Sequence, residues 1–125
     1  HLPGFADVWP TVAPLLDGAA FVAAHNAPFD RRVLAACCQA AGLPEPAQRF
    51  VCTVQLARRR WGQKPNDLAS VCRRLGIGLR HHDAGSDAEA CARIVISAQD
   101  GPVNGSVLGT AARTAGGPPS LPAAR

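Results

Sequence analysis

The sequence has no methionine, although a natural reading frame begins with one. It starts at His1, just before a Pro-Gly turn, so we expect a piece of a longer protein or one shortened at its N-terminus. No apolar stretch reaches transmembrane length without charges, and we expect no membrane partner. The five cysteines form no C-x-x-C pair and follow no secretory signal, so we expect reduced, mostly buried thiols in a cytoplasmic protein.

The composition is that of one small globular domain. Of the 125 residues, 47% are hydrophobic, which is enough for one modest core. Thirteen Lys and Arg against nine Asp and Glu give a formal charge of +4. This mild excess favours a polyanionic partner, although a solvated basic face is the commoner explanation of so small a value.

Two short apolar segments, 19–24 and 49–52, have the length of buried strands. A helix should follow each of them. The first runs from an N-cap at Asn26 to Gly42, and the second runs from a cap at Thr53 to about Arg60. A strand followed directly by a helix is half of a βαβ unit, so this order predicts an α/β fold.

Two further helices are predicted towards the C-terminus. The first is capped by Asn66 and carries Leu68, Val71, Cys72 and Leu75 at helical spacing, ending at Gly76 with Ile77 beyond it. The second spans about 84–98, after a loop over 79–83. At the other end we expect a loop over 1–10 and a short helix over 11–17. Residues 100–125 are rich in Gly, Pro, Ser, Thr and Ala, which predicts a disordered tail.

Two acidic motifs, 25–30 and 82–87, stand at the starts of predicted helices. Asp30 would lie at the carboxyl end of a buried strand, where open α/β sheets bind ligands, and Asp87 begins the last helix. Either acid could also simply favour the helix dipole. His82 can act as a general base near neutral pH, although on chemistry alone His81 is an equal candidate. Acids and a histidine, with no serine or cysteine nucleophile among them, suggest metal-assisted hydrolysis of a phosphodiester.

The two motifs resemble those of a known family. The segment 25–34, HNAPFDRRVL, looks like the second motif of epsilon-subunit-like 3′–5′ exonucleases, which belong to the RNase T and oligoribonuclease superfamily with a four-acid, one-histidine (DEDDh) site. The segment 82–88, HDAGSDA, resembles the third motif, and 51–58 and 68–77 resemble the strand and helices between them. The likeness spans about residues 5–98. It implies a ribonuclease-H-like α/β fold with helices packed on a mixed sheet.

The resemblance also implies roles for particular residues. Asp30 matches an aspartate that helps hold the metal site, often through water, and Asp87 matches a direct metal ligand. His82 matches the histidine that deprotonates the attacking water. The pocket for the terminal nucleotide would be shaped by His25, Asn26 and Phe29. The implied cofactor is a pair of Mg²⁺ or Mn²⁺ ions about 4 Å apart. The implied partners are a single-stranded or frayed DNA 3′ end, or RNA, and a polymerase subunit.

One motif of that family is missing. Its first motif is an Asp-x-Glu pair on the first strand, and the only acids upstream of Asp30 are Asp7 and Asp17. We therefore expect residues 1–99 to form a partial exonuclease domain without its opening strands, with an incomplete two-metal site and little or no turnover. The sequence before His1 is the observation that would decide this.

Three other readings compete with the nuclease. A zinc site lacks ligand spacing, and a nucleophilic Cys52 has no activating neighbour in the sequence. The serious alternative is a non-catalytic nucleic-acid-binding or interaction module on a degenerate exonuclease scaffold. The segment 58–61, Arg-Arg-Arg-Trp, together with Arg73, Arg74 and Arg80, could contact phosphates and stack on a base, whereas the bland reading is an exposed basic helix end.

Overall fold

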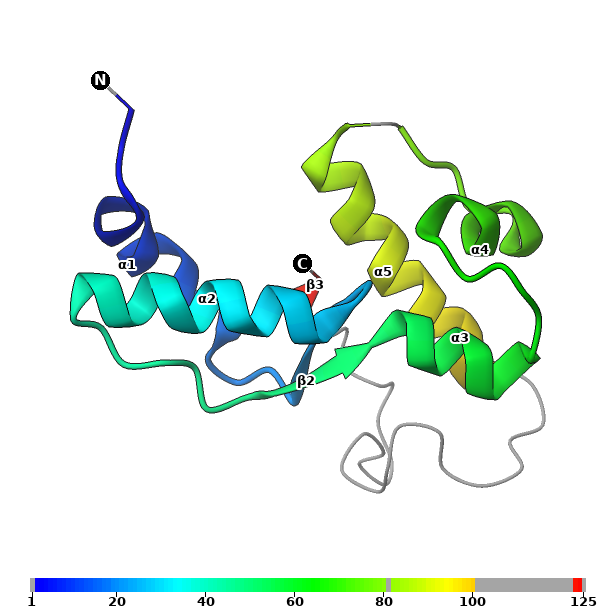
Figure 1. The fold of residues 1–125 in the computed structure, drawn as a ribbon, viewed down its shortest axis with the longest axis horizontal. Coiled ribbons are helices and arrows are strands. Elements are labelled where there is room, and N and C mark those ends of the chain that lie inside the picture. The colour runs from blue at the N-terminus through cyan, green and yellow to red at the C-terminus, as the bar shows by residue number, and fades with distance from the viewer. Residues whose placement is uncertain (1, 81, 101–122, 125) are drawn as a thin grey trace.

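The computed structural model describes residues 2–80, 82–100 and 123–124. Within them helices alternate with strands as far as β2, and three consecutive helices then precede the last strand (Figure 1). In chain order they are α1 (Phe5–Leu16), β1 (Phe21–Ala24), α2 (Ala27–Ala41), β2 (Arg49–Cys52), α3 (Thr53–Trp61), α4 (Leu68–Leu75), α5 (Ala84–Gln99) and β3 (Ala123–Ala124). This arrangement agrees with the α/β class and is compatible with a ribonuclease-H-like fold.

The sheet has the order β2-β1-β3, and both strand pairs are parallel. β1 pairs with β2 along its whole length, from Phe21 opposite Arg49 to Ala24 opposite Cys52. The two residues of β3 pair with Val22 and Ala23. All four residues of β1 are buried, as expected for a parallel strand covered on both faces.

The core lies on both faces of β1. Successive side chains of a strand point to opposite faces, so Phe21 and Ala23 pack with Leu56, Val95 and Ala98 of α3 and α5. On the other face, Val22 packs with Trp9, Leu16 and Cys38 of α1 and α2. A third cluster of Ala57, Val71 and Ile94 joins α3, α4 and α5. Helices packed on both faces of β1 thus fix the position of its carboxyl end.

The turn from β1 into α2 is tighter than the sequence suggests. Asn26 precedes the helix as predicted, but its side chain makes no capping hydrogen bond. Its backbone is left-handed, with φ of 77°, a conformation that asparagine tolerates better than most residues. Pro28 lies in the first turn, where its missing N–H does no harm.

The predicted caps of α3 and α4 are each wrong by one residue. α4 begins after Asp67, whose carboxylate accepts from the Ser70 N–H at 3.1 Å, and not after Asn66. The N-cap of α3 is Cys52, and the Thr53 hydroxyl is used elsewhere. The backbone direction at the start of a helix, as well as the residue type, decides which residue is the N-cap. The sequence alone can therefore misplace a cap by one residue.

The N-terminal segment differs from its prediction as well. Residues 5–10 were expected as a loop and instead belong to α1, despite Pro10 and Pro14. Asp7 accepts from the Gly4 N–H at 2.8 Å, and the rings of Phe5 and Trp9, one turn apart, stack at 5.1 Å. Packing of Trp9 in the core outweighs the hydrogen bonds that the prolines remove.

The remaining predicted elements agree with the structure. β1 falls inside 19–24, β2 covers 49–52, and α5 spans Ala84–Gln99 against the predicted 84–98. α4 ends in the predicted Schellman geometry, with Ile77 N–H donating to the Cys72 carbonyl at 2.8 Å. The predicted disordered tail differs from the structure at Ala123–Ala124, which form β3, while 101–122 and 125 lie outside the described residues. In the part of the chain that the structure describes, no helix has both the length and the apolar character to span a membrane.

Candidate functional site

The carboxyl end of β1 is held by His25, whose two ring nitrogens both contact the protein. Nδ1 lies 2.7 Å from Thr53 Oγ1 at the start of α3, and Nε2 lies 2.6 Å from the Asn66 carbonyl oxygen. A carbonyl only accepts, so Nε2 carries the hydrogen and Nδ1 accepts from the Thr53 hydroxyl. Burial lowers the pKa of His25, against the opposing effect of the Asn66 carbonyl. A neutral histidine therefore ties β1 to α3 and to the loop before α4.

The same network reaches α5 through Cys91. Its sulfur lies 4.0 Å from Thr53 Oγ1, which is fully buried. Burial raises the pKa of the Cys91 thiol most strongly, and the charges of Asp30 and Asp87 raise this pKa further. Both carboxylates therefore act on one buried sulfur from two different helices. The fold thus brings the two acidic motifs to the same region of the molecule.

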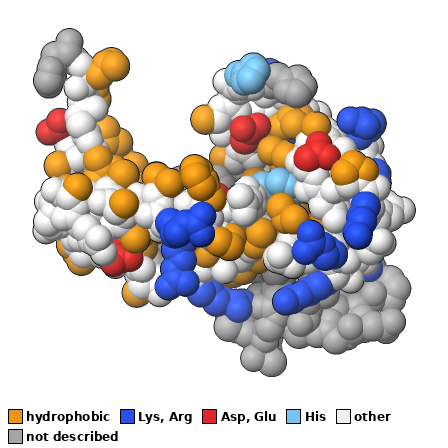
Figure 2. Space-filling view, in the orientation of Figure 1, with side chains coloured by type: hydrophobic (Ala, Val, Ile, Leu, Met, Phe, Trp, Pro, Cys, Tyr) orange, Lys and Arg blue, Asp and Glu red, His pale blue; other side chains and the backbone are white. Residues whose placement is uncertain are grey.

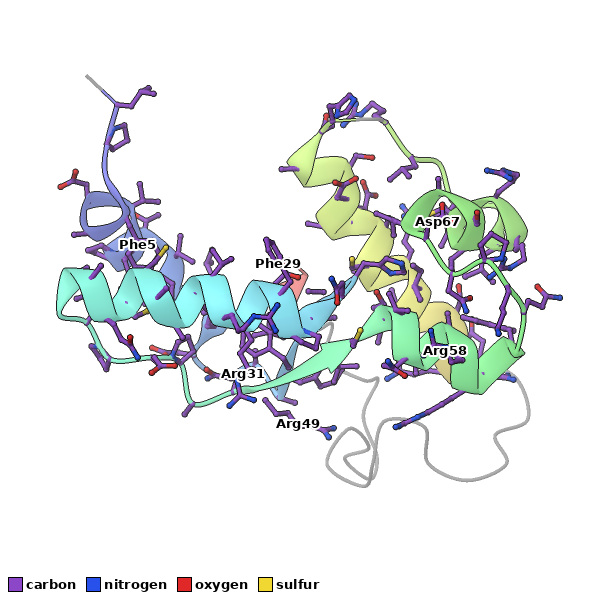
Figure 3. All side chains as sticks on the ribbon, in the orientation of Figure 1. Phe5, Phe29, Arg31, Arg49, Arg58 and Asp67 are labelled. Carbon is purple, nitrogen blue, oxygen red and sulfur yellow. The ribbon has the colours of Figure 1, made fainter. Side chains whose placement is uncertain are left out.

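Asp30 lies in the first turn of α2 and is partly buried. Burial raises the pKa of this carboxyl, while its own backbone N–H lowers it. Asp30 also lines an apolar cavity of about 400 Å³ between α1 and α2, whose other walls include Trp9, Val22 and Phe50. Its neighbour Phe29 is 55% exposed and projects from the start of α2 (Figure 3). An aromatic ring and a carboxylate thus stand together where β1 ends.

Asp87 and His82 lie at the start of α5. Asp83 caps this helix by accepting from the Ser86 N–H at 2.9 Å, and it pairs with Arg80 at 3.3 Å. Because Asp83 performs the capping, the exposed carboxylate of Asp87 is not needed for it. His82 is exposed in the turn before the helix, with a left-handed φ of 59°.

Several residues of this network were not identified from the sequence as site residues. Thr53 looked like a helix cap, Asn66 acts through its backbone carbonyl, and Cys91 looked like core. Asp83 was passed over between His82 and Asp87. The available signal was Asp83 three residues before Ser86, a spacing typical of a capped helix start. Every residue type has a backbone carbonyl, so the sequence does not reveal which carbonyl makes a contact.

The described residues do not supply a complete metal site. Within 2–80, 82–100 and 123–124, no three His, Cys, Asp or Glu side chains lie close enough together to hold an ion. Asp30 and Asp87 are hard oxygen donors of the kind that Mg²⁺ and Mn²⁺ prefer. Two carboxylates are nevertheless too few to hold a pair of divalent ions without further ligands.

Comparisons with known proteins agree on one family. The sequence model of the RNase T family, described as exonuclease, matches residues 2–95. Exodeoxyribonuclease 10 from each of two strains of Escherichia coli is 38% identical over 91 residues. The match covers 68% of this chain and 37% of each relative, so the chain spans little more than a third of their length. No solved structure matches the chain.

Proposed function

Since the chain belongs to the RNase T exonuclease family, we propose that it carries part of the active site of a metal-dependent 3′–5′ exonuclease of the DEDDh, epsilon-like type. The proposed substrate is DNA, entered at a single-stranded or frayed 3′ end and released as nucleoside monophosphates. RNA is the alternative substrate, and a polymerase subunit is a candidate partner. The relatives' name, exodeoxyribonuclease, supports DNA over RNA.

One observation carries the proposal. Asp30 and Asp87 are 57 positions apart in the sequence (87 − 30), yet both raise the pKa of the Cys91 thiol. A carboxylate that only stabilises the dipole of its own helix has no reason to share a neighbouring residue with a carboxylate of another helix. A shared neighbour that lies beside His25, just after β1, supports a ligand site there, because open α/β sheets bind ligands at the carboxyl ends of their strands.

The proposed roles follow the chemistry of each side chain. Asp30 and Asp87 bind divalent Mg²⁺ or Mn²⁺, which when bound supplies charge for the scissile phosphate. His82 accepts the proton of the attacking water, a role that an imidazole can fill near neutral pH. Phe29 and Asn26 shape the pocket for the terminal nucleotide. His25 contributes by holding β1, because both of its ring nitrogens are engaged with the protein.

These residues need further carboxylates to complete the metal site. All nine acids of the sequence lie within the described residues, and they do not form a group that could hold an ion. We therefore propose that an Asp-x-Glu pair from outside these 125 residues completes the site, and that the chain alone turns over substrate slowly or not at all.

The experiment compares the chain with a version extended at its N-terminus by a strand carrying Asp-x-Glu. Each is incubated with Mn²⁺ and a strand labelled at its 5′ end, and the products are resolved by length. We expect stepwise shortening from the 3′ end by the extended chain and at least a 100-fold loss in rate for Asp87→Asn and His82→Ala, in line with losses of a catalytic group. Unchanged digestion by either variant would refute the residue assignment. Rapid digestion by the 125-residue chain would refute the need for further carboxylates.

A non-catalytic nucleic-acid-binding module is the second candidate. The observation that favours it is the absence of a metal-holding group from the described residues. It predicts binding of oligonucleotides by the extended chain without any metal-dependent shortening.

A further inference from the structure

The charges of this chain are unevenly distributed between the candidate site and its neighbourhood. Between Asp30 and Asp67 the sequence has one acid, Glu45, against seven cations. These are Arg31, Arg32, Arg49, Arg58, Arg59, Arg60 and Lys64. Asp30 of the candidate site thus borders a stretch of chain whose charged residues are nearly all basic.

Five of these cations lie on the adjoining elements α2, β2 and α3. Arg31 and Arg32 lie in the first turns of α2, Arg49 begins β2, and Arg58 and Arg59 lie on α3. All five are exposed. Figure 2 shows Lys and Arg side chains gathered on one face over these elements, and Figure 3 labels Arg31, Arg49 and Arg58 there. We call these five residues the arginine surface.

Several arginines elsewhere in the described residues hold other parts of the fold together. Arg80 pairs with Asp83, and Arg93 pairs with Glu89 at 2.9 Å. Arg60 donates to the carbonyls of Ala98 and Asp100. On the arginine surface, by contrast, Arg58 donates to the uncharged Gln55, and the Arg49 guanidinium lies 5.7 Å from the centre of the Phe21 ring. The contact of Arg58 with a neutral amide orients its side chain without neutralising its charge.

The surface also has a hollow next to the candidate site. A cavity of about 450 Å³ is lined by Arg31 and Arg32 together with Pro28, Phe50 and Cys52. Arg31 follows Asp30 directly, so this cavity adjoins the first turn of α2, where the acid lies. Two guanidinium groups beside apolar walls suit a phosphate with its attached sugar.

The extent of the surface fits several phosphates. β2 leads straight into α3 (Figure 1), so Arg49 and Arg58 are separated by three strand steps and six helical steps. At ~3.3 Å and ~1.5 Å per step this distance is about 19 Å. At ~3.4 Å between phosphates along a stacked strand, it corresponds to five or six phosphates.

We propose that the arginine surface binds the phosphate backbone of a single strand of nucleic acid beyond the nucleotide held at the candidate site. This inference rests on the proposed function, which puts the 3′ end of the nucleic-acid strand at the candidate site. It explains why cations gather beside the acids: the strand's body is attracted to α2, β2 and α3, while its end meets Asp30 and Asp87. Binding at this surface should be sensitive to salt and tolerant of sequence.

The test measures binding without chemistry. A labelled 20-nucleotide single strand is titrated with the 125-residue chain in chelator, and fluorescence anisotropy is recorded from 0.05 to 0.3 M salt. Two double variants, Arg31→Gln with Arg32→Gln and Arg58→Gln with Arg59→Gln, are compared with a control, Arg73→Gln with Arg93→Gln, which removes the same charge from α4 and α5. A titration with polyglutamate of equal charge is run beside them.

Each surface variant should reduce the slope of log K against log salt by about 1.4 and weaken binding about 25-fold at 0.1 M salt, because each phosphate contact contributes ~0.7 to the slope for single strands. The control should bind like the parent. Equal weakening by the control, no binding at the lowest salt, or equally tight binding of polyglutamate would overturn the proposal. Thermal unfolding of each variant verifies that it is folded.

The outcome separates this proposal from the proposed function. If the surface variants lose binding and the extended chain still fails to shorten a strand, the surface stands and the nuclease assignment falls. If the extended chain digests DNA while the surface variants bind as the parent does, the surface proposal alone is refuted.

Discussion

The imidazole of His25 accepts a hydrogen bond from the Thr53 hydroxyl over 2.7 Å, between residues 28 positions apart. Thr53 is fully buried, and the other ring nitrogen of His25 is bound to the Asn66 carbonyl at 2.6 Å. This pair fixes the end of β1 relative to α3 at a half-buried position. The position of Asp30, five residues after His25, depends on it.

Thr53→Val should lower the free energy of unfolding by about 1–3 kcal/mol, because it leaves Nδ1 of His25 buried without a donor. Urea unfolding measures this change. Thr53→Ser keeps the hydroxyl and serves as the matched control, which should recover most of the loss. If valine and serine have the same effect, the hydrogen bond contributes nothing and only the methyl group matters.

The stability of the chain should fall as pH drops below about 6.5. Burial lowers the pKa of His25 from its ordinary value of 6.5, so the unfolded chain takes up a proton in a range where the folded chain does not. The stability contributed by neutral His25 is fully present above pH 6.5. It is lost as the pH falls towards the pKa that His25 has in the folded chain. Urea unfolding between pH 7.5 and 5 should show this decline, and His25→Gln should flatten it. The exposed His82→Gln is the control and should leave the decline in place; a decline that His25→Gln does not alter would contradict the assignment.

Asp87→Asn should weaken binding of Mn²⁺, because an amide lacks the negative charge that a hard divalent cation prefers. Isothermal titration of the extended chain measures the affinity, and we expect a loss of at least 10-fold. Glu89→Gln is the control on the same helix, since Glu89 is paired with Arg93. Equal losses in the two variants would mean that only the net charge of α5 matters.

Ile94→Ala should cost about 2–5 kcal/mol, because Ile94 is completely buried where α3, α4 and α5 meet. Ile96→Ala, two positions along and 39% exposed, should cost less than about 1 kcal/mol. Thermal and urea unfolding of the two variants gives the comparison. Similar costs would show that the third cluster is not tightly packed.

The sequence predicts the elements around β1 well, because local pattern and tertiary packing agree there. The apolar run 19–24 is too short for a helix, and β1 is indeed buried on both faces. Gly42 and Gly76 end α2 and α4 in the left-handed conformation that glycine adopts readily. These features depend on residues close together in the chain.

Prediction from the sequence fails where distant contacts decide. α1 contains Pro10 and Pro14, and its helical form depends on Trp9 packing against Val22 and Cys38. The role of Thr53 could not be inferred either, because its partner His25 lies on another element. The candidate residues Asp30, His82 and Asp87 came from motif order, and their roles stay predictions. What the structure adds is that two of these acids act on Cys91.

The turn at 25–28 has a consequence for how freely this chain can change. Four successive residues are each constrained by a different physical requirement: His25 by two hydrogen bonds, Asn26 by a left-handed backbone, Ala27 by burial at 2% exposure, and Pro28 by its place in the first helical turn. No single substitution type satisfies all four. In a library of random variants sorted for folding, residues 25–28 should therefore tolerate fewer substitutions than the other residues at the carboxyl edge of the sheet. This should hold even when the library is not selected for catalysis.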